Sequence, residues 1–155
     1  MAIEIEKKYL VTNNQFKETV DSALFRQGYL SVEAERTVRV RSYNGKGFLT
    51  VKGINHSCSR EEYEYEIPEQ DANSMLDSLC VQPIIEKKRY FVTYEGLEWV
   101  VDEFLGENQG LVVAEIELES EQQKFKKPDW IGKEVTSDIR YYNSNLVNNP
   151  YKGWK

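Results

Sequence analysis

The sequence predicts an α+β fold in which a mostly antiparallel β-barrel of six to eight strands carries a few helices on its outside. The first observation behind this class is the alternation of polar and apolar residues with period 2, which is typical of strands with two unlike faces. The second is that just two stretches show the spacing of an amphipathic helix. A chain of 155 residues can bury one core, so we expect a single domain over residues 1–155.

Alternation marks seven segments as strands and an eighth more weakly. We expect strands at residues 2–11, 36–43, 48–53, 60–67, 84–94, 97–104 and 111–119, with 27–32 as the weaker candidate. Asn44-Gly45 and Glu95-Gly96 suit two-residue hairpin turns. If both turns are tight, Arg39 lies opposite Thr50 with Lys52 on the same face, and Arg89 lies opposite Asp102. The charged side chains then converge on one face of each hairpin.

Two stretches predict helices. Residues 14–25 place apolar side chains from Phe16 to Leu24 on one stripe, and residues 69–79 do the same from Ala72 to Leu79. The tail from Pro128 onward predicts short helices only.

The balance of charge excludes one class of function. Acidic residues outnumber basic ones by 26 to 20, whereas a generic nucleic-acid-coating domain depends on surplus Lys and Arg. Two cysteines, Cys58 and Cys80, are too few for a disulfide scaffold, and we find neither a signal peptide nor an apolar run of membrane length. We therefore expect a cytoplasmic protein without nucleic-acid or membrane partners. The sequence leaves the oligomeric state open, a homodimer included.

Ionisable side chains occupy alternate positions in several strands, and each strand tends to carry one sign. The acidic positions are Glu4 and Glu6, then Glu62, Glu64 and Glu66, then Glu115, Glu117 and Glu119; the basic ones are Lys8, Arg39, Arg41, Lys52, Lys87 and Arg89. Residues i and i+2 lie about 6.5–7 Å apart on one face of a strand, so like charges there repel. One such strand would favour a solvated outer face. Five together favour the interior of a barrel wide enough to hold water and a ligand, with the mostly apolar opposite faces covered from outside.

This combination of charges predicts a particular kind of ligand. Carboxylate oxygens suit Mg²⁺ or Mn²⁺, and clustered Arg and Lys suit phosphate oxygens. Both sets in one cavity predict a metal-complexed polyanion, most simply a chain of phosphates. The chain has no Gly-rich P-loop, and its one histidine, His56, lies in a predicted loop, which argues against a His-ligated zinc site. We interpret His56, Cys58 and Cys80 as non-catalytic.

Eight short motifs follow one another along the chain in the order found in a known protein family. The motifs are E-x-E-x-K at 4–8, V-R-V-R at 38–41, L-T-V-K-G at 49–53, R-E-E-Y-E-Y-E-I-P at 60–68, E-K-K-R-Y at 86–90, W-V-V-D-E-F at 99–104, A-E-I-E-L at 114–118 and G-K-E-V-T at 132–136. Together they cover nearly the whole chain, which resembles the short, single-domain bacterial members of the CYTH superfamily, the triphosphate tunnel metalloenzymes. The resemblance implies an eight-stranded antiparallel β-barrel that forms a tunnel, with helices packed outside.

The resemblance also implies roles for individual residues. Divalent metal, Mg²⁺ or Mn²⁺, would be bound by Glu4, Glu6, Asp102, Glu115 and Glu117, with Glu119 as an added candidate. The triphosphate would be held by Lys8, Arg39, Arg41, Lys52, Lys87 and Arg89, which with Glu4 and Glu6 form the expected catalytic set. Glu62 and Glu64 match further tunnel carboxylates at the substrate site, with a role that is metal-related or organisational. A basic residue near the C-terminus, Arg140 or Lys133, matches too loosely to assign.

The implied activity is metal-dependent hydrolysis of the terminal phosphate of a triphosphate, a small-molecule substrate that we expect to be inorganic tripolyphosphate. Three alternatives stay open on the same tunnel. They are an adenylate cyclase of class IV, a thiamine triphosphatase, and a non-catalytic module that binds polyphosphate or a nucleotide.

Overall fold

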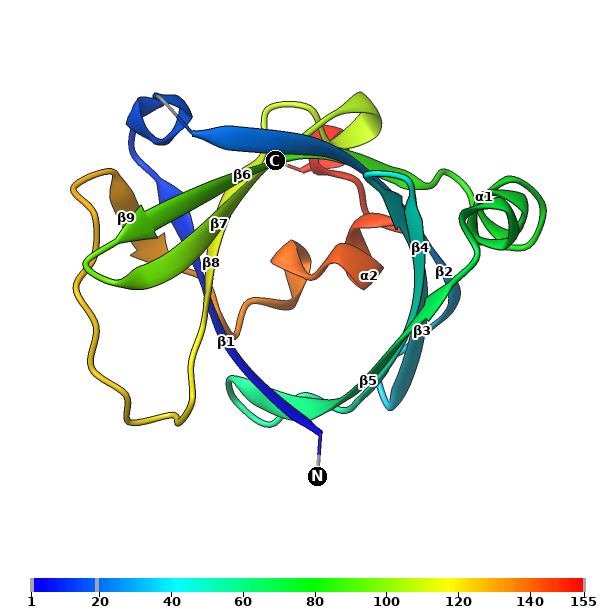
Figure 1. Cartoon of the computed structure of the whole chain (residues 1–155), viewed down its shortest axis with the longest axis horizontal. Helices are drawn as coiled ribbons and strands as arrows, with labels where there is room; N and C mark the ends of the chain where they lie inside the picture. Colours follow the sequence, from blue (N-terminus) through cyan, green and yellow to red (C-terminus); the bar gives the residue numbers. More distant parts are fainter. Residues whose placement is uncertain (1, 19, 155) are drawn as a thin grey trace.

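The computed structural model describes residues 2–18 and 20–154, and its strands close into a barrel (Figure 1). The strands are β1 (Ile3–Val11), β2 (Asp21–Glu33), β3 (Arg36–Tyr43), β4 (Lys46–Gly53), β5 (Ser59–Ile67), β6 (Ile85–Tyr94), β7 (Leu97–Phe104), β8 (Val112–Glu117) and β9 (Ile131–Glu134). Their order is β5-β4-β3-β2-β6-β7-β8-β1-β9, and β1 also pairs with β5, so β1 to β8 form a ring. The pairings among these described strands are antiparallel, which confirms the expected eight-stranded barrel.

Strand β1 closes the ring because it pairs along both of its edges. Ile3 to Ile5 pair with β5, and Glu6 to Leu10 pair with β8. Beyond the contact with β5, β9 joins β1 at Tyr9 and Val11. Closure therefore brings the acidic positions of β1 next to those of β5 and β8, which lie far away in the sequence.

Both predicted hairpin turns form, with the expected registers. Arg39 lies opposite Thr50 and Arg89 lies opposite Asp102. The turn residues Asn44, Gly45, Glu95 and Gly96 have φ angles of 53°, 77°, 50° and 77°, as a type I′ turn requires. These two turns align the charged faces of β3 with β4 and of β6 with β7.

The helix predicted for residues 14–25 is wrong. Of the described residues in this stretch, Gln15–Lys17 form a 3-10 helix, and β2 begins at Asp21; Thr19 lies outside the described residues. From Asp21 to Gln27 the chain pairs with β6, and this long-range pairing outweighs the local helical spacing. The expected strand at 27–32 is confirmed as the second half of β2.

The other predicted helix forms as α1 (Glu69–Ser78) and packs on the outside of the barrel beside β3 and β4. Its buried Ala72 and Leu76 contact Val40 of β3 in one apolar cluster. Gly47 of β4 lies directly beneath, and a Cβ built on it would stand 2.7 Å from the Cβ of Ala72. The close approach of helix and sheet therefore requires a glycine here.

Loops and one short 3-10 helix, with no α-helix among the described residues, cover the outer faces of β1, β7 and β8. Trp99 is fully buried at the centre of an aromatic cluster, where Tyr9 lies 5.7 Å from it and Trp130 lies 6.4 Å from it, ring centroid to centroid. Phe16 of the 3-10 helix Gln15–Lys17 and Phe125 of the loop after β8 complete the cover. On β5, by contrast, Tyr63 and Tyr65 remain 39% and 61% exposed, so our expectation of a covered outer face is wrong for this strand.

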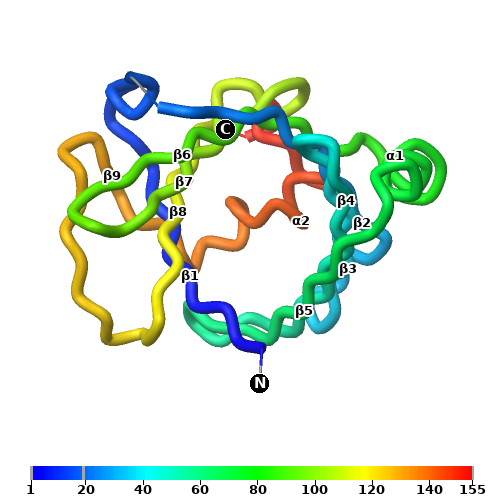
Figure 2. The backbone as a smooth tube through the Cα atoms, viewed as in Figure 1, coloured from blue at the N-terminus to red at the C-terminus, as the bar shows by residue number. Residues whose placement is uncertain are grey.

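The C-terminal tail enters one end of the ring, where Figure 2 shows it crossing the interior. It contains α2 (Asn143–Leu146) between the 3-10 helices Ile139–Tyr141 and Tyr151–Gly153. Leu146 and Val147 are buried in a cluster with inward residues of the strands, including Phe104 and Val113. The prediction of short helices is confirmed for these segments, but it missed β9. The expectation that helices pack outside is wrong for α2, because the apolar end of the barrel interior needs a cover.

Within the described residues, no helix combines the length and the apolar character that crossing a bilayer would require.

We expect Gly47→Ala to lower the free energy of unfolding by about 1–3 kcal/mol, because the added methyl group forces α1 away from β4. Gly153→Ala is the matched control, since a Cβ there would meet nothing within 4 Å. Urea denaturation of both variants measures the difference. Equal stability of the two would mean that α1 does not depend on this close approach.

Candidate active site

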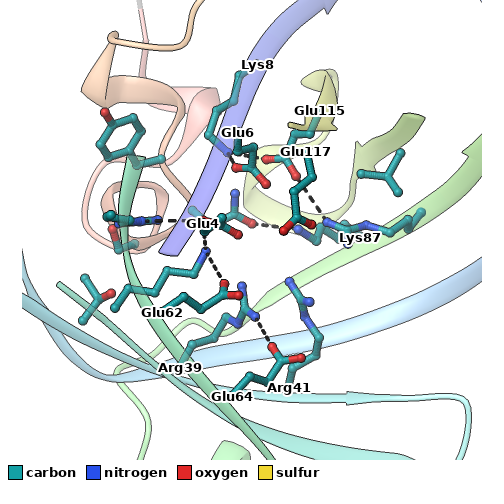
Figure 3. A pocket seen from close by; sticks show the side chains of 18 of the residues that line it. Glu4, Glu6, Lys8, Arg39, Arg41, Glu62, Glu64, Lys87, Glu115 and Glu117 are labelled. Carbon is teal, nitrogen blue, oxygen red and sulfur yellow. Dashed lines mark hydrogen bonds and ion pairs between the residues drawn. The ribbon is translucent and has the colours of Figure 1, made fainter. Parts of the chain in front are cut away.

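Charged side chains line a cavity of about 390 Å³ inside the barrel (Figure 3). The acidic ones are Glu4, Glu6, Glu62, Glu64, Glu98, Glu115 and Glu117; the basic ones are Lys8, Arg39, Arg41, Lys52, Arg60, Lys87 and Arg89. Seven charges of each sign cancel formally among these described residues. One divalent cation would therefore make the lining net positive.

The structure brings together most of the residues that the sequence singled out. Of the expected site residues, Asp102 and Glu119 are absent from the cavity lining. Asp102 is buried just beneath it, whereas Glu119 follows the end of β8 at Glu117 and is exposed. Of the two loose candidates in the tail, Arg140 pairs with Asp138 at 2.7 Å on the surface, and Lys133 is exposed on β9.

Asp102 of β7 holds two cations of β6 in place. Its carboxylate accepts hydrogen bonds from Arg89 at 2.7 and 2.9 Å and forms a 2.8 Å ion pair with Lys87. Burial alone would raise the pKa of Asp102, but Arg89 and Lys87 hold it well below its usual range. Burial in turn lowers the pKa of Lys87 to about 7, against the opposing effect of Asp102. Both carboxylate oxygens of Asp102 are thus engaged by basic side chains.

Lys8 of β1 lies between two glutamates. Its ammonium donates to Glu6 at 3.0 Å and to Glu115 of β8. Burial would raise the pKa of Glu115, but the charge of Lys8 and its neighbours brings it to about 2, so this carboxylate is ionised. The pKa of Glu6 is raised by burial and by the nearby charge of Glu115. A further cation beside Glu6 would therefore stabilise the ionised form of its carboxylate.

A second acidic group surrounds Lys52 of β4. The Lys52 ammonium lies 2.9 Å from a carboxylate oxygen of Glu4 and 3.2 Å from one of Glu62. Burial and the charges of Glu4, Glu62 and Glu6 raise the pKa of Glu117. Burial first and the neighbouring carboxylates second therefore disfavour the ionised form of Glu117.

Two arginines of β3 form the opposite, basic side. The Arg39 guanidinium donates from Nη2 to Thr50 at 3.1 Å and to Glu64 at 3.2 Å, while its buried Nε has no hydrogen-bond partner in the described structure. Arg41 donates from Nε to Gln27 at 2.9 Å. Burial, together with the charges of Arg39 and Arg89, lowers the pKa of Arg41 to about 9, so it stays charged at neutral pH.

Sequence reasoning missed several lining residues. Arg60 and Glu98 follow the same alternation as Glu62 and Asp102, so a stricter count along β5 and β7 would have found them. Tyr29, Thr37 and Val100 also line the cavity, as do the tail residues Tyr142, Asn143 and Ser144. The tail residues have no periodic signal, because they reach the cavity only through the path of the folded tail.

The donor set fits a hard divalent cation in its chemistry. Among the described residues, no three His, Cys, Asp or Glu side chains converge closely enough to coordinate one ion, since Glu4, Glu6 and Glu115 turn an oxygen to a lysine. The candidate donors are nevertheless all carboxylate oxygens, as Mg²⁺ and Mn²⁺ prefer. The pKa values of Glu6 and Glu117 are raised by burial and then by neighbouring carboxylates, and a bound cation would favour the ionised form of both.

Comparison with known proteins gives a consistent result. A family model described as the CYTH domain matches residues 2–151. An inorganic triphosphatase from Acetivibrio thermocellus is 57% identical over 155 residues, covering 100% of this chain and 99% of the relative. One from Nitrosomonas europaea is 35% identical over 148 residues, covering 93% and 96%. A crystal structure of an inorganic triphosphatase superposes with a TM-score of 0.66 at 31% identity, covering 92% of this chain and 96% of that one.

We expect Asp102→Asn to lower the free energy of unfolding by about 3–5 kcal/mol, because it removes the buried carboxylate charge that pairs with both Lys87 and Arg89 and leaves Arg89 with only the longer 3.5 Å pair to Glu115. Asp138→Asn, which weakens an exposed pair with Arg140, should change it by less than about 1 kcal/mol. Urea denaturation without added metal compares them. Similar values for the two variants would mean that the buried cations do not rely on Asp102.

Proposed function

The chain belongs to the CYTH domain family, and on that premise we propose that it is a metal-dependent triphosphatase whose preferred substrate is inorganic tripolyphosphate. The observation that carries the proposal is the cavity itself, in which basic side chains from β1, β3, β4 and β6 face carboxylates from β1, β5 and β8. Support for the substrate comes from the full-length similarity to two proteins named inorganic triphosphatase.

Basic residues of this chain supply the contacts to the triphosphate. We assign this role to Lys8, Arg39, Arg41, Lys52, Lys87 and Arg89. The unpartnered Nε of Arg39 is a donor that a phosphate oxygen can accept from, and burial strengthens such a bond. Arginine presents several donors in one plane, which suits the oxygens of a phosphate chain.

Glutamates of β1 and β8 are the residues that would hold the divalent cation, Mg²⁺ or Mn²⁺. We assign Glu4, Glu6, Glu115 and Glu117, with Glu62 and Glu64 as carboxylates that bind or organise the same region. When bound, the cation supplies neutralisation of charge on the phosphate oxygens. Asp102 has a different part in the proposal, since it orients Lys87 and Arg89. Glu119 has no part in it, because it lies beyond the cavity.

The protein also has to hold fixed charges around the substrate and to keep bulk water out of the cavity. Charges fixed in a buried cavity need no reorganisation when negative charge develops on the departing phosphate, and such fixed stabilisation is a large part of catalysis. The tail covers one end of the barrel with apolar side chains such as Leu146, which limits the access of bulk water from that side. The carboxylate that accepts the proton of the attacking water is not assigned.

One observation favours a second candidate. A smaller cavity of about 280 Å³ adjoins the first, shares Thr37, Arg60, Tyr142 and Ser144 with it, and has apolar walls that include Ile54. Such a space suits an organic group attached to a triphosphate. Nucleoside and thiamine triphosphates, and the cyclase reaction on ATP, therefore belong in the same assays.

The cytoplasmic location and the lack of nucleic-acid and membrane partners remain predictions. The oligomeric state is still undecided, with a homodimer among the possibilities.

We expect purified protein with Mg²⁺ or Mn²⁺ to release phosphate from tripolyphosphate, and EDTA to abolish the release. Glu4→Ala and Arg41→Ala should lower kcat/KM by about 10²-fold or more, since each removes a buried charge from the cavity. Arg140→Ala is the matched control for Arg41→Ala, because Arg140 is on the surface. Orthophosphate and cyclic AMP are measured with tripolyphosphate, ATP and thiamine triphosphate side by side.

No metal-dependent phosphate release from any of these triphosphates would overturn the hydrolase proposal. Cyclic AMP from ATP would point to the cyclase, and tight binding of a triphosphate without turnover would point to the non-catalytic binding module.

A further inference from the structure

A short network of hydrogen bonds links the C-terminal tail to the basic side of the cavity. Asn143, the first residue of α2, accepts at Oδ1 from the Lys87 ammonium at 2.9 Å and from Gln27 Nε2 at 2.6 Å. Gln27 of β2 is fully buried, and its Oε1 accepts from Arg41 Nε at 2.9 Å. The chain of contacts therefore runs from Arg41 through two neutral amides to Lys87.

The chemistry of the two cations fixes the direction of every bond in this network. A lysine ammonium and an arginine guanidinium can only donate. Asn143 must therefore turn its oxygen to Lys87, and Gln27 must turn its oxygen to Arg41. That leaves the Gln27 amide nitrogen to donate to Asn143, as the 2.6 Å contact requires. Both amides have one acceptable orientation.

The network also determines which donors remain for a substrate. The Lys87 ammonium has three N–H groups; Asp102 engages one at 2.8 Å and Asn143 a second at 2.9 Å. The third is free to point elsewhere, and Lys87 and Asn143 both line the cavity. With two partners fixed, a flexible four-carbon side chain is held in one arrangement. Without Asn143, it is held by Asp102 alone.

We propose that Asn143 is a positioning residue which, directly and through Gln27, orients Lys87 and Arg41 toward the triphosphate. The inference rests on the proposed function, because it assigns both cations to the substrate. It makes the tail a part of the active site and more than a cover. The buried Leu146 and Val147 anchor the tail, and Asn143 is three residues before that anchor.

The experiment compares Asn143→Leu, Gln27→Leu, the double variant and Asn143→Asp with the wild type. Kinetics on tripolyphosphate with Mg²⁺ give kcat and KM. Calorimetry with an imido-bridged triphosphate, which resists hydrolysis, gives affinity without turnover. Asn149→Ala is the control, since Asn149 is an exposed residue of the same tail whose backbone oxygen accepts from Trp154. Thermal melts establish that each variant is folded.

We expect Asn143→Leu to lower kcat by about 10-fold to 100-fold and to weaken binding of the analogue, because a small misplacement of a contact group costs this much. Asn143→Asp keeps an oxygen that accepts both bonds but adds negative charge, so its kcat should stay near that of the wild type while its KM rises. The double variant should lose no more than about twofold beyond the worse single variant, since both residues act in one network.

Three results overturn the inference. The first is wild-type kinetics and affinity in Asn143→Leu. The second is a fold-loss of kcat in the double variant that equals the product of the two single-variant losses. The third is a loss in Asn149→Ala equal to that in Asn143→Leu. If the wild type binds the analogue but does not hydrolyse tripolyphosphate, the proposed function fails, and the affinities of the variants decide the inference. If the wild type does neither, both fail.

Discussion

Burial of charge is the constraint on which the rest of this structure depends. The barrel interior holds carboxylates, ammonium groups and guanidinium groups, and an unpaired ion there costs several kcal/mol. Most of the charged strand pairs therefore meet in a register that brings opposite signs together, although Glu6 lies opposite Glu117. The tight turn at Glu95-Gly96 does this for Arg89 and Asp102, and ring closure through β1 does it for Lys52 and Glu4.

A charged interior moves the apolar core to other places. In many small barrels the inward side chains fill the centre, whereas here the buried apolar clusters lie outside the strands or at one end of the ring. Trp99 packs under loop residues, Val40 under α1, and Phe104 under the tail. Loops and tail thus have a structural task that a filled barrel would not give them, and the tail comes to lie against the cavity.

The division of the cavity into two sides explains how an acidic protein can hold a polyanion. Carboxylates crowd near Lys52 and Lys8, where the pKa values of Glu6 and Glu117 are raised, while Arg39 and Arg41 face them. The lining as a whole is formally neutral, so under the proposed function a bound cation would give it the net positive charge that attracts a triphosphate. The net charge of −6 gives no hint of this, because it averages over the surface.

The sequence by itself determined the features that depend on neighbouring residues: the alternation along seven strands, the two hairpin registers, α1, and the inward direction of charges such as Glu4 and Arg39. Tertiary structure decided the features that depend on distant partners. Pairing with β6 turned the last part of the predicted helix at 14–25, from Asp21 onward, into strand, and pairing with β1 created β9. Asn143 reaches the cavity for the same reason, since its partners Lys87 and Gln27 are 56 and 116 residues away. A local sequence pattern indicates the structure that one segment prefers. It does not identify the remote segment with which that segment will form hydrogen bonds.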